Sequence, residues 1–77
     1  MTRAEVWRLL GAPDDQIGSV NEPRAIEEHG FSWNEKWLHR NAVGRIVKVV
    51  LWNRYDLVAI FRVDEDGSWQ PAPLPER

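Results

Sequence analysis

Residues 44–69, GRIVKVVLWNRYDLVAIFRVDEDGSW, restrict the fold of this chain more than any other segment. Two runs dense in β-branched residues, RIVKVVLW and LVAIFRV, are each followed by a turn-forming stretch, NRYD and DEDG. β-Branched side chains favour a pleated strand, whereas Asn, Asp and Gly favour tight turns. The pattern predicts two long antiparallel strands and a short further strand at residues 68–70.

The preceding stretch, FSWNEKWLHR at residues 31–40, is compatible with either a helix or a strand. A helix would align Trp33 with Trp37 but would place Phe31 and Leu38 poorly. A strand puts Phe31, Trp33 and Trp37 on one face, and the following HRNAVGR can close a hairpin. We therefore expect a strand, which makes three long strands in all.

A helix is predicted at the N-terminus. Thr2 and Glu5 have the spacing of a capping box, and Gly11 and Pro13 end the pattern. One side of the helix is apolar and must pack on another element, through Val6, Trp7, Leu9 and Leu10. The fold class predicted is therefore α+β, an N-terminal helix packed on a three- to four-stranded antiparallel β-meander.

The 77 residues are expected to form a single small domain. Residues 14–30 leave two alternatives open, because few apolar side chains occur there. They form either an irregular loop or a short helix that begins at Pro23 and ends before Gly30. Three prolines in residues 71–77 predict an extended tail.

Four-residue loops at NRYD and NAVG would fix the strand register and place Trp33 opposite Trp52. We then expect Glu35 and Lys48 to pair across the same face. Most side chains of this first face are apolar, so it is the predicted core face beneath the helix. Its members are Phe31, Trp33, Glu35, Trp37, His39, Ile46, Lys48, Val50, Trp52, Leu57, Ala59, Phe61 and Val63.

The opposite face of the predicted sheet has an apolar centre and a basic rim. One short helix cannot cover both faces, so residues 14–30, the tail, barrel closure or another chain must cover this one. Exposed apolar patches with polar rims are typical of interfaces. The predicted partner-binding residues are Lys36, Leu38, Arg40, Arg45, Val47, Val49, Leu51, Val58, Ile60 and Arg62.

The charge distribution suggests what kind of partner such a face would meet. The net charge is −2 overall, but residues 31–63 hold six basic and two acidic side chains, a net +4 between two acidic ends. A basic middle favours an acidic partner, although the ends could also neutralise it within one fold. The leading hypothesis is a non-enzymatic interaction module that binds itself, as a homodimer, or binds an acidic-surfaced protein.

Two other hypotheses remain. Single-stranded RNA binding would use basic residues with stacking aromatics, here Arg54 and Tyr55 at a hairpin tip and Trp69 near Arg62. Against it, the sequence pI of about 5.6 is below the usual basic footprint of nucleic-acid binders.

A small-ligand or metal site in residues 21–39 is the third hypothesis. The side chains available are those of His29, His39, Glu27, Glu28 and Glu35, with the polar pairs Asn21–Glu22 and Asn34–Glu35 and nearby Arg24. The spacing matches no metal-ligand pattern, and turn and cap chemistry accounts for the same residues. No catalytic, cofactor-binding or metal-binding residue is therefore predicted. The chain has no Cys and no long apolar run, which is compatible with the cytosol and predicts no membrane partner.

Overall fold

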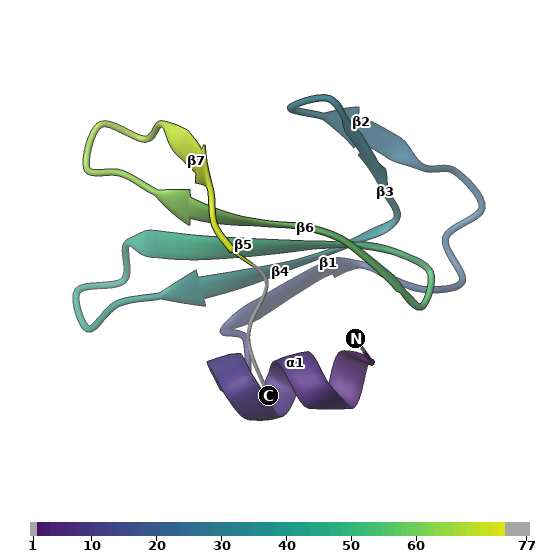
Figure 1. Cartoon of the computed structure of the whole chain (residues 1–77), viewed down its shortest axis with the longest axis horizontal. Helices are drawn as coiled ribbons and strands as arrows, with labels where there is room; N and C mark the ends of the chain where they lie inside the picture. Colours follow the sequence, from purple (N-terminus) through teal and green to yellow (C-terminus); the bar gives the residue numbers. More distant parts are fainter. Residues whose placement is uncertain (1, 74–77) are drawn as a thin grey trace.

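A five-stranded antiparallel sheet lies between a helix on one face and a two-stranded hairpin on the other (Figure 1). The computed structural model describes residues 2–73. Its elements are α1 (Arg3–Leu10), β1 (Asp15–Gly18), β2 (Ile26–Glu28), β3 (Phe31–Trp33), β4 (Glu35–Arg40), β5 (Ile46–Asn53), β6 (Asp56–Val63) and β7 (Trp69–Pro71). The main sheet has the order β1-β4-β5-β6-β7, and β2 pairs with β3. The α+β class and the antiparallel sheet are confirmed, but the three- to four-stranded meander is wrong.

Helix α1 begins and ends as its sequence predicts. The Thr2 hydroxyl accepts from the Glu5 backbone N–H, and the Glu5 carboxylate accepts from the Thr2 N–H, which completes the capping box. At the other end, Gly11 donates its N–H to the Trp7 carbonyl with a φ of 85°, a conformation that glycine adopts without strain. No helix in residues 2–73 is long and apolar enough to cross a lipid bilayer.

Residues 14–30 are neither a loop alone nor a short helix. They contain β1, which pairs with β4, and β2, which pairs with β3. The start of β1 is fixed by Arg40, whose Nε lies 2.9 Å from Asp15 Oδ2 and whose backbone N–H donates to Asp14 Oδ2. Backbone pairing and these polar contacts, rather than apolar side chains, place β1 in the sheet.

Residues 31–40 are not one strand, because the chain breaks at Asn34. The buried Asn34 side chain accepts from the Arg54 N–H at 2.7 Å, while its backbone N–H donates to the Trp52 carbonyl. Its carbonyl accepts from the Ser19 N–H. The break turns Trp33 to the opposite face of the sheet from Trp52, so the two buried indoles are not the cross-strand neighbours that the predicted register makes them.

Register shifts in β4–β5 and β5–β6 move further residues between faces. One lies between His39 and Arg40, and another lies between Leu51 and Trp52. Beyond the second shift Val50 pairs with Ile60 rather than with Ala59. Ile60 therefore joins the face toward α1. Besides Trp33, the predicted core-face residues that belong to or pack against the opposite cluster are Ile46, Ala59, Phe61 and Val63.

The sheet carries an apolar cluster on each face. The cluster beneath α1 consists of Val6, Trp37, Val50, Trp52 and Ile60. The cluster on the other face consists of Trp33, Leu38, Val49, Leu51 and Phe61. The β2–β3 hairpin crosses this second cluster, and β3 contacts both β5 and β6 (Figure 1). The second face of the sheet is thus covered from within the chain.

The C-terminal segment also belongs partly to the fold. The predicted last strand is present as β7, and Ala72 packs against the cluster beneath α1 while donating its N–H to the Ile60 carbonyl at 2.9 Å. Of the residues 71–77 predicted as an extended tail, Pro71 is the last residue of β7 and Ala72 packs on the fold. Residues 74–77 lie outside the described part of the chain.

Candidate binding pocket between α1 and β1

The apolar centre of the predicted partner-binding face is buried. Val49 and Leu51 have no exposed surface, Leu38 is nearly as buried, and Val47 and Val58 are half-buried. Ile60 is buried too, but on the α1 side of the sheet. In this fold the set does not form one continuous exposed patch.

The basic rim of that face is engaged within the chain. Each of the predicted basic residues has an oxygen acceptor in a neighbouring element or turn. Lys36 pairs with Glu28 (2.9 Å), Arg40 with Asp15 (2.9 Å) and Arg62 with Asp64 (3.4 Å), while Arg45 donates to the Val63 carbonyl (3.2 Å). Acidic residues outside residues 31–63 therefore neutralise part of the basic middle within the chain.

An aromatic cluster fastens the hairpin to the sheet. The Lys36 ammonium lies 4.8 Å from the Trp33 ring centroid and 5.4 Å from that of Trp69. The His29 imidazole stacks on Trp69, with ring centroids 4.1 Å apart. Cation–π and stacking contacts of this kind hold neighbouring elements together. We assign Lys36, Trp69 and His29 to the attachment of the hairpin.

The residues considered for RNA stacking are only partly available. Tyr55 is 70% exposed at the β5–β6 turn. The neighbouring Arg54 donates from Nη1 to the Val20 carbonyl at 2.7 Å, and Trp69 is covered by His29. Of these three residues, only Tyr55 has both an exposed ring and, within residues 2–73, no other ring stacked on it.

Some polar residues of the 21–39 region have structural partners. Asn34 joins β3 to β4, and the Asn21 N–H donates to Ser19 Oγ. Within residues 2–73 no three His, Asp or Glu side chains are grouped so as to hold a metal ion. His39 is buried, and burial, followed by the nearby Lys48 charge, lowers its pKa below the ordinary value of 6.5.

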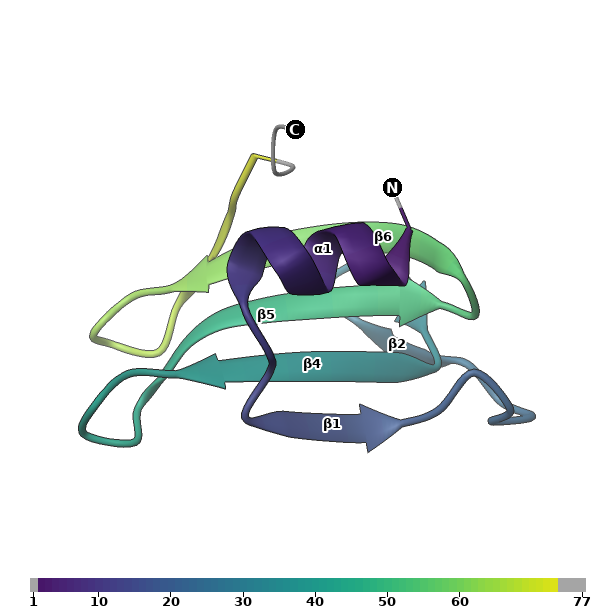
Figure 2. The same cartoon turned by 90° about the horizontal axis from the view of Figure 1, so that it is seen from below.

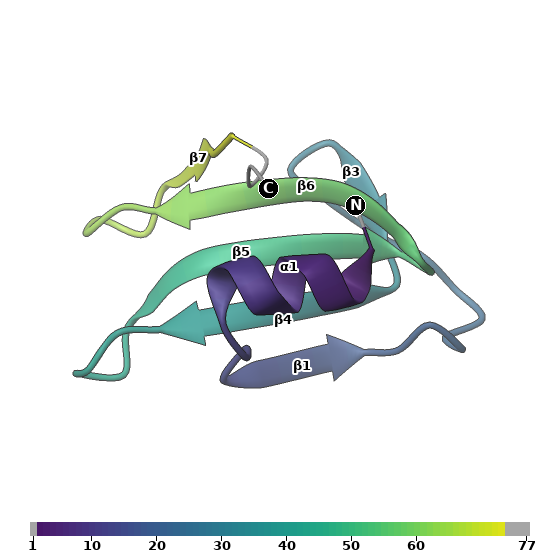
Figure 3. The ribbon, with the colours of Figure 1, turned by 60° about the horizontal axis from the view of Figure 1, so that its bottom comes forward.

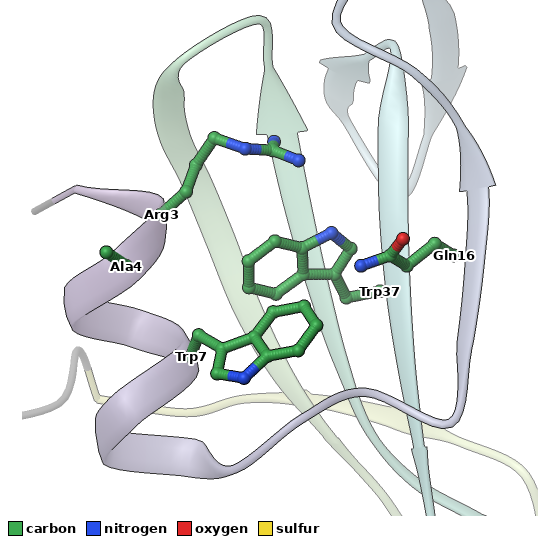
Figure 4. A pocket seen from close by; sticks show the side chains of 5 residues that line it. All are labelled: Arg3, Ala4, Trp7, Gln16 and Trp37. Carbon is green, nitrogen blue, oxygen red and sulfur yellow. The ribbon is translucent and has the colours of Figure 1, made fainter.

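A pocket of about 340 Å³ opens between α1 and the β1–β4 edge of the sheet (Figure 4). Its lining residues come from three elements and are Arg3, Ala4, Trp7, Gln16 and Trp37. Trp37 is buried, whereas Trp7 is 43% exposed. The two indoles meet nearly at right angles, with centroids 5.6 Å apart and an interplanar angle of 89°. The two rings form two walls of the pocket, and one side of the pocket is open to solvent.

A largely buried ion pair between α1 and β4 involves one lining residue of this pocket, Arg3. Nη2 of Arg3 lies 2.7 Å from each carboxylate oxygen of Glu35, and Trp37 Nε1 donates to the same carboxylate at 2.7 Å. The Arg3 guanidinium also stands 5.0 Å from the Trp37 ring centroid. The predicted Glu35–Lys48 pair is wrong, because Lys48 lies opposite His39. The Glu35 carboxylate accepts hydrogen bonds from Arg3 and Trp37, which hold α1 and the Trp37 indole in place.

The pocket lining is mostly apolar and aromatic, with few polar groups. Its lining offers indole rings, a methyl group, a guanidinium already paired with Glu35, and one amide, that of Gln16. General acid–base work needs a titratable group within hydrogen-bond reach of the substrate, and nucleophilic catalysis needs an activated nucleophile. The lining supplies neither.

The sequence did not predict this pocket, but it placed two of its five lining residues, Trp7 and Trp37, at the contact between helix and sheet. The apolar stripe of α1 indicated that Trp7 faces the sheet, and the strand pattern indicated that Trp37 lies beneath it. Gln16 was missed because β1 has no alternating apolar pattern: Ile17 is the one large apolar residue in DQIG. The sequence matches no family model, and no curated protein or solved structure is significantly similar to it.

Proposed function

We propose that this chain is a small non-enzymatic interaction module that captures an apolar side chain of a protein partner in the pocket between α1 and β1. The observation that carries the proposal is the exposed Trp7, held at right angles to the buried Trp37 over a preformed space. Partly exposed tryptophans in concave sites are typical anchors of protein interfaces. Because both faces of the sheet carry buried clusters, the pocket formed by Trp7 and Trp37 is the docking point that the observations support best.

The size and lining of the pocket define the occupant. A space of about 340 Å³ accommodates a leucine-sized or aromatic side chain. An aromatic ring packed against indole gains about 0.5–1.5 kcal/mol beyond its buried area. The Gln16 amide at the rim can donate to or accept from the partner backbone and so orient it. We expect weak affinity for an isolated side chain and a preference for aromatic over small aliphatic groups.

The experiment is a titration followed by ¹H–¹⁵N correlation spectra of the full chain. The added probes are N-acetyl-tryptophanamide, N-acetyl-leucinamide and N-acetyl-alaninamide. We expect saturable shifts of the Trp7 indole and the Gln16 side-chain amide with the first two probes and none with the third. The Trp33 and Trp69 indoles, on the other face of the sheet, are internal references that stay unchanged.

Matched variants separate the pocket from general surface hydrophobicity. Trp7→Ala removes the exposed wall of the pocket, whereas Tyr55→Ala removes a more exposed aromatic in the β5–β6 turn that does not line the pocket. Binding should be lost in the first variant and retained in the second. Equal shifts in both variants, or shifts that track total exposed aromatic surface, would overturn the proposal.

A further inference from the structure

Strand β1 forms a free edge of the main sheet. It lies outermost in the order β1-β4-β5-β6-β7, and no other described element runs along its outer side (Figure 2). Helix α1 crosses the sheet over β4 and β5 and leaves that edge uncovered (Figure 3). An unpaired edge presents backbone donors and acceptors that can pair with a further strand.

The backbone groups that face outward on β1 can be identified. The Ser19 N–H donates to the Asn34 carbonyl, and the register puts Ile17 and Asp15 at equivalent positions. Because hydrogen-bonding groups alternate along an antiparallel strand, the N–H and C=O groups of Gln16 and Gly18 point away from β4. Two outward residues in this spacing form the pairing unit of an antiparallel ladder.

We propose that two copies of this chain associate by antiparallel pairing of their β1 strands about a two-fold axis at Ile17. In this register Gln16 of one copy pairs with Gly18 of the other, and each exchanges its outward N–H and C=O with the other residue. Ile17 then lies directly opposite Ile17 of the second copy. Ile17 is 44% exposed in the single chain, and the pairing buries it against an identical side chain.

The charges on β1 favour this register over its neighbour. An axis at Ile17 places Asp15 opposite Ser19 of the second copy, so the two Asp15 carboxylates lie at opposite ends of the junction. An axis at Gln16 would bring the carboxylates nearer to each other, which is unfavourable. Arg40 already pairs with Asp15 in each copy and reduces the remaining repulsion.

Self-complementarity is the reason for choosing a second copy as the occupant. A symmetric pairing satisfies the same groups on both chains, and isologous two-fold dimers are the commonest oligomers of soluble proteins. The proposal does not depend on the pocket. Gly18 contributes no side chain where it meets Gln16, so the pocket beside Gln16 keeps its open side in the dimer.

Sedimentation equilibrium on the full chain, from about 10 μM to about 500 μM, tests the proposal. We expect a monomer–dimer equilibrium that Ile17→Lys weakens at least tenfold, because two ammonium groups would face each other across the axis. The matched control is Ile26→Lys, which charges another exposed strand isoleucine, in β2, and should leave the equilibrium unchanged. Circular dichroism of both variants verifies that the fold is retained.

Mixing two variants tests the register itself. Ile17→Lys and Ile17→Glu should each be monomeric alone and should form a mixed dimer when combined, since only an axis at Ile17 places the opposite charges face to face. A parent that stays monomeric throughout overturns the proposal and leaves the edge open to a different chain. A parent dimer that neither variant weakens, or no mixed dimer from the two variants, also overturns it.

Discussion

Arg3 and Glu35, 32 positions apart in the sequence, join α1 to β4 through two contacts of 2.7 Å from a single guanidinium nitrogen. The Glu35 side chain is almost completely buried, and the Arg3 side chain is about one-quarter exposed. Trp37 donates to the same carboxylate, so the helix, the sheet and the Trp37 indole share one polar anchor. A short helix gains most of its stability from such tertiary contacts.

Removing one member of this pair should therefore be costly. Arg3→Met keeps the aliphatic packing but leaves the buried Glu35 carboxylate without a counter-charge. We expect a loss of about 3 kcal/mol in the free energy of unfolding, measured by urea denaturation. Arg8→Met, on the exposed side of the last helical turn, is the matched control and should change stability by less than about 0.5 kcal/mol. Equal losses of unfolding free energy in the two variants would contradict the stabilising role of the Arg3–Glu35 pair.

A charge in the second face of the sheet tests whether the β2–β3 hairpin covers it. Val49 is fully buried in the cluster beneath the hairpin, so Val49→Glu places a carboxylate without a partner in an apolar core. We expect the domain to unfold, which circular dichroism detects as loss of the β signal. Val43→Glu, at an 85% exposed turn position, should remain folded. A folded Val49→Glu chain would mean that this face opens to solvent.

The elements predicted correctly are those specified by neighbouring residues in the sequence, such as caps and turns. The capping box, which spans only residues 2–5, is enough to predict the start of α1. The β5–β6 hairpin follows from two β-branched runs around a turn. In these cases the local preference and the final structure agree, so the sequence alone is sufficient.

The face assignments failed where the pattern is symmetric. In LVAIFRV apolar residues occupy both odd and even positions, and both faces of the sheet carry a buried cluster. A strand that buries one face specifies its register strongly, but here a one-residue shift at Trp52 exchanges one apolar face for another. The hydrophobic pattern cannot detect such a shift.

Gly18 illustrates a second kind of hidden constraint. Its φ is +78°, and a Cβ at this position would lie 2.2 Å from the Asn34 carbonyl oxygen. Gly67 has a similar φ of +88° but nothing within 4 Å of the corresponding position. We expect Gly67→Ala to cost about 1 kcal/mol from backbone strain alone. Gly18→Ala should cost clearly more, because it also forces β1 away from Asn34.

Thermal unfolding of the two glycine variants gives the comparison directly. The difference between their midpoints isolates the steric contact, because the backbone conformations are alike. Identical midpoints would show that β1 can move away from Asn34 without penalty. That result would also weaken the dimer proposal, which requires β1 to be held firmly in the sheet.

His39 makes stability depend on pH. Its buried Nε2 has no hydrogen-bond partner among the described residues, and burial and then Lys48 lower its pKa, against a smaller opposing effect of Asp14. The unfolded chain, with the ordinary value of 6.5, therefore binds a proton more readily than the folded chain does. Where the unfolded state binds more protons, stability rises with pH. The His39 contribution is thus fully present above pH 6.5 and is lost as the pH falls through and below that value.

The corresponding experiment is a set of urea denaturation curves between about pH 7.5 and about pH 5. We expect the free energy of unfolding of the parent to decline toward the acid end of this range. His39→Gln, which cannot take up a proton, should show a smaller decline even if it is less stable at every pH. If His39→Gln and the parent lose stability in parallel as the pH falls, the neutral buried state assigned to His39 is wrong.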